Sequence, residues 1–156
     1  MILPSLYSEI EGPALKNIVK ILSNNKFLNH ITIGLDKANK TQFQDAKIFF
    51  KDLKVPHSVI WNDGPRMKSL DNQLSEQGLA PKEPGKGKNV WYCMGYILAR
   101  DQARSIAIHD CDIVTYNKEL LSMLIYPVAN PLFDYDFCIG YYPRLGNNKL
   151  NGRVTR

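Results

Sequence analysis

Apolar and polar positions along the chain form blocks that favour strands followed by amphipathic helices. The first apolar block, residues 1–3, runs into Pro4, and apolar residues then recur at the three- and four-residue spacing of a helix. Pro13 suits the first turn of that helix. The recurring apolar residues are Leu15, Ile18, Val19 and Leu22. The opening of the chain therefore predicts one strand and one helix that packs by a single face.

Two more strands are predicted in the first half of the chain. The apolar run at residues 31–35 ends at Asp36, and a helix follows that has apolar residues on one face. These residues are Phe43, Ala46, Phe50 and Leu53. Residues 57–61 predict a third strand, which stops at the turn-forming sequence Asn62-Asp63-Gly64-Pro65.

The second half of the chain predicts further elements of both kinds. Residues 69–76 favour a short helix, and the prolines and glycines of residues 78–88 disfavour regular structure in the loop that follows. Residues 89–100 are apolar nearly all round, which predicts a buried helix. The remaining elements are a short buried strand at 105–109, a helix at 118–126, a strand at 137–142 and a polar, basic tail.

This order of elements predicts the fold class. Strands that alternate with helices of this length indicate an α/β fold with right-handed crossovers and a mostly parallel sheet. A chain of 156 residues that is 44% hydrophobic can bury a core and requires only one domain. We therefore predict a single α/β unit with helices flanking the sheet.

Composition narrows the classes of function and the cellular environment. The net charge is +5 with a pI near 9.1, but no Lys/Arg block dominates, so small anionic ligands fit as readily as nucleic acid. Three widely spaced cysteines without a Cys-x-x-Cys pair indicate reduced thiols in a cytoplasmic protein. No apolar run approaches the roughly 20 residues of a membrane span. We predict a soluble cytoplasmic protein.

Candidate site residues follow from the predicted sheet. Ligands of open α/β sheets bind beyond the carboxyl ends of the strands, so the residues directly after each strand are the candidates. They are Ser5 to Glu9, Asp36, Asn62-Asp63 and residues 110–112.

The sequence Asp110-Cys111-Asp112 is the strongest candidate for a metal site. Alternate residues of an extended segment point the same way, so both carboxylates can reach one hard cation that also binds substrate phosphate. The alternative is that both aspartates only cap a turn. A second copy of the pattern, Asp134-Tyr135-Asp136, comes before a predicted strand and is expected at the opposite end of the sheet.

Gly85-Lys86-Gly87-Lys88, at the start of a predicted helix, favours phosphate binding through backbone N–H groups, the helix N-terminus and a lysine. It lacks the spacing of a P-loop or a Gly-x-Gly-x-x-Gly fingerprint, and a flexible loop with solvated lysines is the alternative. The three histidines, His30, His57 and His109, have no partner at metal-ligand spacing, so structural roles are predicted for them.

Five separated motifs carry a resemblance to a known family. They are Leu3-Pro4-Ser5-Leu6-Tyr7-Ser8-Glu9, Glu11-Gly12-Pro13-Ala14-Leu15, Gly85-Lys86-Gly87, His109-Asp110-Cys111-Asp112 and Asn151-Gly152-Arg153-Val154-Thr155. Together they resemble the glucosyl-3-phosphoglycerate synthases, which are retaining glycosyltransferases with a Rossmann-like GT-A fold. The resemblance implies that residues 1–156 are the N-terminal, nucleotide-sugar-binding portion of such a domain, ending in an acceptor loop at about residues 143–156.

The same resemblance implies roles for individual residues. The nucleotide-sugar contacts would be Leu6, Glu9, Asp36, Lys86 and Asp110. Asp112 would be the principal ligand of Mg²⁺ or Mn²⁺. The acceptor would contact Gly152, Arg153, Val154 and Thr155. The implied reaction transfers glucose from UDP-glucose or another nucleotide-hexose to the 2-hydroxyl of 3-phosphoglycerate, with neither nucleic acid nor a membrane as partner.

Other interpretations stay open at this point. Enzymes of this family continue with further sheet, another metal ligand and a dimerising segment, so a truncated chain without turnover and a homodimeric full-length protein are expected. The alternatives are a non-catalytic nucleotide-sugar-binding module and a mannosyl-3-phosphoglycerate-type transferase. A sugar nucleotidyltransferase ranks last, because residues 4–9 contain no glycine. Tyr7-Ser8 also stands before Glu9, where many GT-A enzymes carry an asparagine.

Overall fold

The computed structural model describes residues 1–140, 144–146 and 149–151. Its centre is a parallel sheet of three strands in the order β1-β2-β3. The strands are β1 (Ile2–Leu6), β2 (Ile31–Asp36) and β3 (His57–Trp61). The helices are α1 (Pro13–Leu22), α2 (Lys40–Phe50), α3 (Pro65–Glu76), α4 (Lys86–Arg100) and α5 (Lys118–Ala129), and a 3₁₀ turn, η1 (Tyr7–Ile10), follows β1. The predicted α/β class is confirmed.

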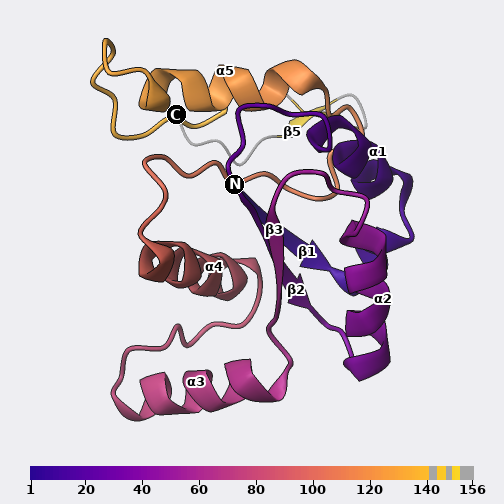
Figure 1. Ribbon diagram of the computed structural model, residues 1–156, viewed down its shortest axis with the longest axis vertical. Coiled ribbons are helices and arrows are strands. Elements are labelled where there is room, and N and C mark those ends of the chain that lie inside the picture. Colours follow the sequence, from indigo (N-terminus) through magenta and orange to yellow (C-terminus); the bar gives the residue numbers. More distant parts are fainter. Residues whose placement is uncertain (141–143, 147–148, 152–156) are drawn as a thin grey trace.

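The helices form layers on the two faces of the sheet. Figure 1 shows α1 and α2 on one face and α4 on the other. On β2, Ile31, Ile33 and Leu35 belong to the main hydrophobic cluster with α1 and α2, whereas Gly34 lies against α4. Successive side chains of a strand point to opposite faces, so this alternation buries both sides of β2.

The core lies mainly between the sheet and α1 and α2. Four apolar residues of α1, Leu15, Ile18, Val19 and Leu22, are almost completely buried, and α2 adds Phe50, which has no exposed surface. Burying a side chain of this size stabilises the fold by about 1.5–3 kcal/mol. The helix-period pattern of the sequence therefore identified the main core correctly. The second cluster, Ile2, Cys93 and Ile97, joins α4 to the other face.

Two helices begin earlier than predicted, and α5 extends three residues beyond the predicted end at residue 126. Helix α3 begins at Pro65 rather than at residue 69, because proline is well suited to a first helical turn. Helix α4 begins at Lys86 rather than at residue 89, so the loop before it is shorter than predicted. The prediction that α4 is buried all round was wrong, since Trp91 is 41% and Leu98 is 71% exposed. Only one side of α4 packs on the sheet.

The predicted strand at residues 105–109 is reduced to a single bridge. Ile108 pairs in parallel with Ile2, and hydrogen bonds join Ile2 N to Ala107 O at 2.7 Å and His109 N to Ile2 O at 3.2 Å. Ile2 is the first residue of β1, so only the last residues of the segment 105–109 lie beside that strand. The chain nevertheless runs parallel to β1 as it approaches Asp110.

The predicted strand at residues 137–142 was wrong for the part that can be described. Residues 137–140 are in no strand, and Phe137 and Ile139 are 77% and 67% exposed. An alternating pattern becomes a strand only where a neighbour satisfies its backbone groups. Two short strands that the sequence did not predict, β4 (Arg144–Gly146) and β5 (Lys149–Asn151), instead form an antiparallel pair.

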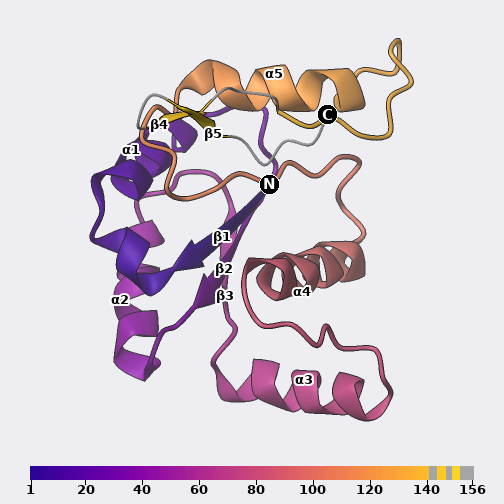
Figure 2. The ribbon, with the colours of Figure 1, turned by 180° about the vertical axis from the view of Figure 1, so that it is seen from behind.

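Helix α5 lies apart from the carboxyl ends of the strands. In Figure 2 it crosses the end of the molecule where β1 begins, while α3 lies at the opposite end. Among the helices that the structure describes, none is both long and apolar enough to cross a lipid bilayer.

Candidate functional site

A cleft of about 560 Å³ opens at the carboxyl ends of the three strands. The strand register produces it, because Leu6 of β1 pairs with Asp36 of β2 and the backbone N–H of Asn62, just after β3, donates to Leu35 O at 3.0 Å. Residues from α3 and the start of α4 form the other wall. The cleft is lined by Pro4, Ser5, Leu6, Glu9, Asp36, Lys37, Asn62, Asp63, Met67, Lys68, Asp71, Pro84, Gly85, Lys86, Lys88, Asn89 and Tyr92.

Asp36 is the best-supported carboxylate of this cleft. The Asn62 amide donates to Asp36 Oδ1 at 2.7 Å, and the Asn89 amide donates to Asp36 Oδ2 at 3.0 Å. Hydrogen bonds to an ionised carboxylate are stronger than those between neutral groups. The two amides therefore stabilise the negative charge and fix the orientation of the Asp36 side chain.

The loops after β2 and β3 are fastened to each other beside Asp36. The backbone N–H of Ala38 donates to Asp63 Oδ2 at 3.0 Å, and Trp61 Nε1 donates to Ala38 O at 2.7 Å. Lys37, which lines the cleft, directly precedes Ala38 and has a φ of 54°. The ligand-facing loops are thus held by side chains of the scaffold.

Glu9 is the carboxylate at the β1 side of the cleft. Its Oε2 accepts from the backbone N–H of Leu6 at 2.9 Å, which folds η1 back onto the strand end. Burial raises the pKa of Glu9, and the nearby charges of Asp112 and Asp110 raise it further, against the lowering effect of the hydrogen bonds from Leu6 and Ser5. Glu9 therefore shares one electrostatic environment with the Asp110-Cys111-Asp112 turn.

The N-terminus of α4 also faces the cleft. Gly85 precedes it with a φ of 119°, a conformation that glycine adopts without strain. Lys86, in the first turn, forms an ion pair with Asp110. Unpaired N–H groups at a helix start attract anions, and a lysine beside them adds positive charge. The structure thus brings the predicted phosphate loop into direct contact with the predicted metal motif.

A second ion pair joins α4 to α3 across the wall of the cleft. Lys88 Nζ lies 2.7 Å from Asp71 Oδ1, and the Tyr92 hydroxyl donates to the same carboxylate. Burial and the interaction with Asp71 raise the pKa of Tyr92 to about 12, and the hydrogen bonds from Lys88 and Tyr92 lower the pKa of Asp71. These contacts position α3 against α4.

The Asp110-Cys111-Asp112 turn is anchored by its middle residue. Cys111 is 2% exposed, whereas Asp110 is partly buried and Asp112 is exposed to solvent. Among the residues that the structure describes, no three His, Cys, Asp or Glu side chains are grouped closely enough to hold a metal ion together. The exposed Asp112 carboxylate fits one position of a hard cation, and diphosphate oxygens are the usual further ligands of Mg²⁺.

His109 fixes the start of this turn. It is 3% exposed, its Nδ1 lies 2.9 Å from the Tyr116 hydroxyl, and burial lowers its pKa to about 4 although the charge of Asp110 acts in the opposite direction. A buried neutral imidazole is consistent with the structural role predicted for this histidine.

The second aspartate pair is placed differently from the prediction. Asp134 and Asp136 are exposed and follow α5 in a loop, because no strand forms over residues 137–140. The argument that they lie at the far end of a strand was therefore wrong. Their separation from the cleft was predicted correctly, since neither residue lines it.

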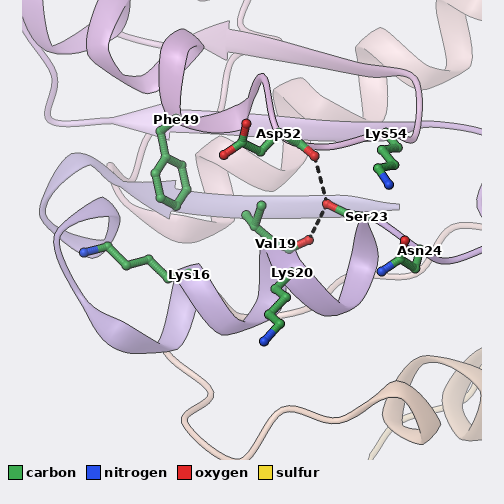
Figure 3. A pocket seen from close by; sticks show the side chains of 8 residues that line it. All are labelled: Lys16, Val19, Lys20, Ser23, Asn24, Phe49, Asp52 and Lys54. Atoms are coloured by element: carbon green, nitrogen blue, oxygen red, sulfur yellow. Dashed lines mark hydrogen bonds between the residues drawn. The ribbon is translucent and has the colours of Figure 1, made fainter.

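Two other hollows contain none of the predicted site residues. One of about 330 Å³ lies between α1 and the segment after α2, where the Ser23 hydroxyl donates to Val19 O and Asp52 O at 2.8 and 3.1 Å (Figure 3). The other, of about 980 Å³, lies between α5 and the amino ends of the strands and has a mostly apolar wall. Neither combines carboxylates with a helix N-terminus as the cleft does.

Two curated relatives match the whole of this chain. It is 46% identical over 156 residues to the glucosyl-3-phosphoglycerate synthase of Persephonella marina, and covers 38% of that protein. It is 38% identical over 159 residues to the glucosyl-3-phosphoglycerate synthase of Methanococcoides burtonii, and covers 39% of that protein. The chain is related to the glucosyl-3-phosphoglycerate synthases. It spans about two fifths of the length of the curated relatives it matches.

No protein-family model matches the chain, and no solved structure matches it either. The relationship to the glucosyl-3-phosphoglycerate synthases therefore rests on the two full-chain matches and agrees with the resemblance seen in the motifs.

The structure brings together the five residues that were predicted as nucleotide-sugar contacts. Leu6, Glu9, Asp36 and Lys86 line the cleft, and Asp110 joins them through Lys86. The predicted acceptor residues, Gly152, Arg153, Val154 and Thr155, lie outside the described residues. The ligands of all these residues stay predictions.

Sequence reasoning missed Asn89, which is almost completely buried at the bottom of the cleft. Asn89 lies in a helical stretch that is otherwise apolar and was predicted to be buried. A buried amide requires hydrogen-bond partners, so a polar residue at this position could have been identified as a candidate. Asp71 and Tyr92 were missed as well, since nothing in the sequence indicates that α3 and α4 lie side by side.

Proposed function

We propose that this chain is the nucleotide-sugar-binding part of a metal-dependent, retaining glycosyltransferase. The proposed reaction transfers glucose from a nucleotide diphosphate sugar to the 2-hydroxyl of 3-phosphoglycerate. The bond between the anomeric carbon and the diphosphate breaks, a bond to the acceptor oxygen forms, and the hydroxyl proton is released. The names of the two relatives support a glucosyl-3-phosphoglycerate product. The nucleotide diphosphate donor, the 2-hydroxyl, the metal and the retention of configuration are proposed from the resemblance of the motifs.

The observation that carries this proposal is the cleft itself. One opening of about 560 Å³ combines the nucleoside-side carboxylates Glu9 and Asp36 with the N-terminus of α4 and Lys86. A nucleoside diphosphate needs hydrogen-bond acceptors for its base or ribose and a positively polarised region for its phosphates. The cleft has both among the residues that line it.

Asp112 is the residue that would hold a divalent cation, with Asp110 beside the ribose and sugar. A carboxylate oxygen is a ligand that Mg²⁺ and Mn²⁺ accept, and the diphosphate would provide further oxygens. When bound, such a cation neutralises charge that develops on the departing diphosphate. Lys86, which pairs with Asp110, would approach the same phosphates from the helix side.

The proposed acceptor contacts are Gly152, Arg153, Val154 and Thr155. Arginine suits the phosphate and carboxylate of 3-phosphoglycerate because its planar guanidinium binds oxyanions through two hydrogen bonds. This part of the proposal rests on the motif and on the names of the relatives.

Isothermal titration calorimetry of the chain with UDP-glucose, GDP-glucose and ADP-glucose tests the donor site. We expect binding of at least one donor with MgCl₂ present and weaker binding with EDTA. Failure of all three donors to bind would overturn the proposal. Incubation of a polypeptide of the relatives' full length with the bound donor and 3-phosphoglycerate then distinguishes a transferase from a binding module. NMR of the product determines whether the anomeric configuration is retained.

A further inference from the structure

The support of Asp36 comes from two elements that are distant in the sequence. Asn62 follows β3, and Asn89 lies in the second turn of α4, yet their amide nitrogens donate to different oxygens of the same carboxylate. Two donors on two oxygens fix the plane of the carboxylate as well as its position. Each carboxylate oxygen retains a further lone pair that can accept a hydrogen bond.

Asn89 is unusually well fixed for a polar residue. It is 2% exposed, its amide nitrogen also donates to Gly34 O at 2.8 Å, and its Oδ1 accepts from the Cys93 thiol at 3.5 Å. An apolar side chain would satisfy the contact between α4 and the sheet without the cost of burying an amide. An apolar residue could make neither the hydrogen bond to Gly34 O nor the one to Asp36, and only the bond to Asp36 reaches a side chain that lines the cleft.

Gly34 makes room for this amide. A Cβ atom at position 34 would lie 1.8 Å from Asn89 Oδ1 and 2.7 Å from Cys93 Sγ, distances that real contacts do not reach. Glycine therefore permits the close approach of α4 to β2. The backbone of the sheet, the helix and the carboxylate are arranged around a single amide group.

We propose that Asn89 is a positioning residue for nucleoside recognition. Together with Asn62 it fixes Asp36 so that the remaining lone pairs of the carboxylate accept from an N–H or O–H group of the nucleoside. The bound group is therefore a hydrogen-bond donor of the base or the ribose, and the phosphates are bound separately at the start of α4. This inference rests on the proposed function and adds the residue on which the orientation of Asp36 depends.

The test compares a ligand that has a nucleoside with one that has none. Calorimetry of Asn89→Ala is expected to show about tenfold weaker binding of the nucleoside diphosphate that the unmodified chain binds best, chosen from UDP, GDP and ADP, because Asp36 loses one of the two donors that orient it. The affinity for inorganic pyrophosphate is expected to be unchanged, since Lys86 and the helix start are intact. Equal weakening for both ligands would contradict the inference and indicate general damage to the cleft.

A double-mutant cycle separates positioning from packing. If Asn89 acts through Asp36, Asn89→Ala adds no further loss of nucleotide affinity in an Asp36→Ala background. Additive losses would overturn the inference. Cys93→Ala is the matched control, because it removes a buried sulfur atom beside Asn89 without removing a donor to Asp36. It is expected to leave nucleotide affinity within about twofold of the original, because both amide donors to Asp36 remain.

A further variant guards against failure of Asn89→Ala to fold. Asn89→Leu keeps the number and branching of the side-chain heavy atoms and lacks the amide, so its thermal unfolding midpoint is expected to remain close to that of the unmodified chain while nucleotide affinity falls about tenfold. If folded Asn89→Leu binds the nucleotide with full affinity, the inference about Asn89 is overturned and the proposed function is not. Absence of binding of UDP, GDP and ADP by the unmodified chain would overturn the proposed function with it.

Discussion

The chain contains the pattern Asp-x-Asp twice, and the two copies have different surroundings. Asp110-Cys111-Asp112 follows a segment that runs beside β1, with its middle residue 2% exposed and its first aspartate paired with Lys86. Asp134-Tyr135-Asp136 follows α5, with its middle residue 59% exposed. The difference shows that a short acidic pattern can form a binding site only where buried neighbours fix the positions of its carboxylates. Each copy therefore serves as a control for the other.

The largest expected effect of this comparison is on metal-dependent binding. Asp112→Asn removes the negative charge of the proposed cation ligand at constant size, and we expect the Mg²⁺-dependent affinity for a nucleoside diphosphate to fall at least a hundredfold, because loss of even an outer partner of a metal site costs ten- to a hundredfold. Asp136→Asn makes the same chemical change in the other turn and is expected to leave the affinity unchanged. Calorimetry with and without EDTA measures both variants. Equal losses of Mg²⁺-dependent affinity in Asp112→Asn and Asp136→Asn would contradict the assignment of the metal site to the first turn.

The next effect concerns the residue before the first turn. The folded pKa of His109 is about 4, below its ordinary value of 6.5, so between these values the unfolded chain binds a proton that the folded chain does not. This contribution to stability is fully present above pH 6.5 and is lost as the pH falls toward 4. It amounts to about 3 kcal/mol.

Urea unfolding at a series of pH values tests this expectation. His109→Gln should show a smaller fall in the free energy of unfolding between pH 6.5 and 4 than the original chain. The difference between the two chains isolates His109 from His30, whose pKa is also lowered, mainly by burial. Parallel stability curves for the two chains would show that His109 does not remain neutral in the folded state.

The middle residues of the two turns are expected to affect the free energy of unfolding. Here the smaller truncation has the larger effect, because its site is buried. Cys111→Ala removes only a sulfur atom, but from a buried position, and is expected to destabilise the fold by about 1 kcal/mol. Tyr135→Ala removes a whole aromatic ring and is expected to change stability by no more than about 0.5 kcal/mol, because the ring is largely exposed. Urea unfolding of both variants measures the effect. A larger loss for Tyr135→Ala would mean that the second turn is covered in the folded protein.

The same contrast explains how far the sequence could be interpreted. Local patterns predicted β1, β2 and β3 and the face of α1, because short apolar runs mark the strands and helix-spaced apolar residues mark the buried face of α1. Residues after those strands were predicted to meet, and Leu6 and Asp36 do so through strand register. For these residues, the periodicity and the topology of parallel sheets were sufficient.

What the sequence could not predict depends on contacts between distant segments. Residues 137–140 have a strand-like pattern but no neighbour to pair with, and the hydrogen bond from Asn89 to Asp36 joins residues 53 positions apart. The ion pair between Lys86 and Asp110 likewise depends on where α4 begins relative to a segment 24 residues later. Such contacts follow from the packing of whole elements, which no local pattern contains.

The smallest expected effect concerns the first aspartate of each turn and the stability of the fold. The ion pair of Asp110 with Lys86 is between side chains that are 35% and 54% exposed, and pairs of this kind contribute at most about 1 kcal/mol. Asp110→Asn should therefore change the free energy of unfolding only slightly.

Asp134 has a φ of 53°, in the left-handed region that asparagine tolerates as well as aspartate does. Asp134→Asn should therefore change the free energy of unfolding by less than about 0.5 kcal/mol. Urea unfolding at pH 7 measures both. A loss above 1 kcal/mol for Asp134→Asn would indicate that its carboxylate has a partner in the folded protein, and the second turn would then be supported as the first one is.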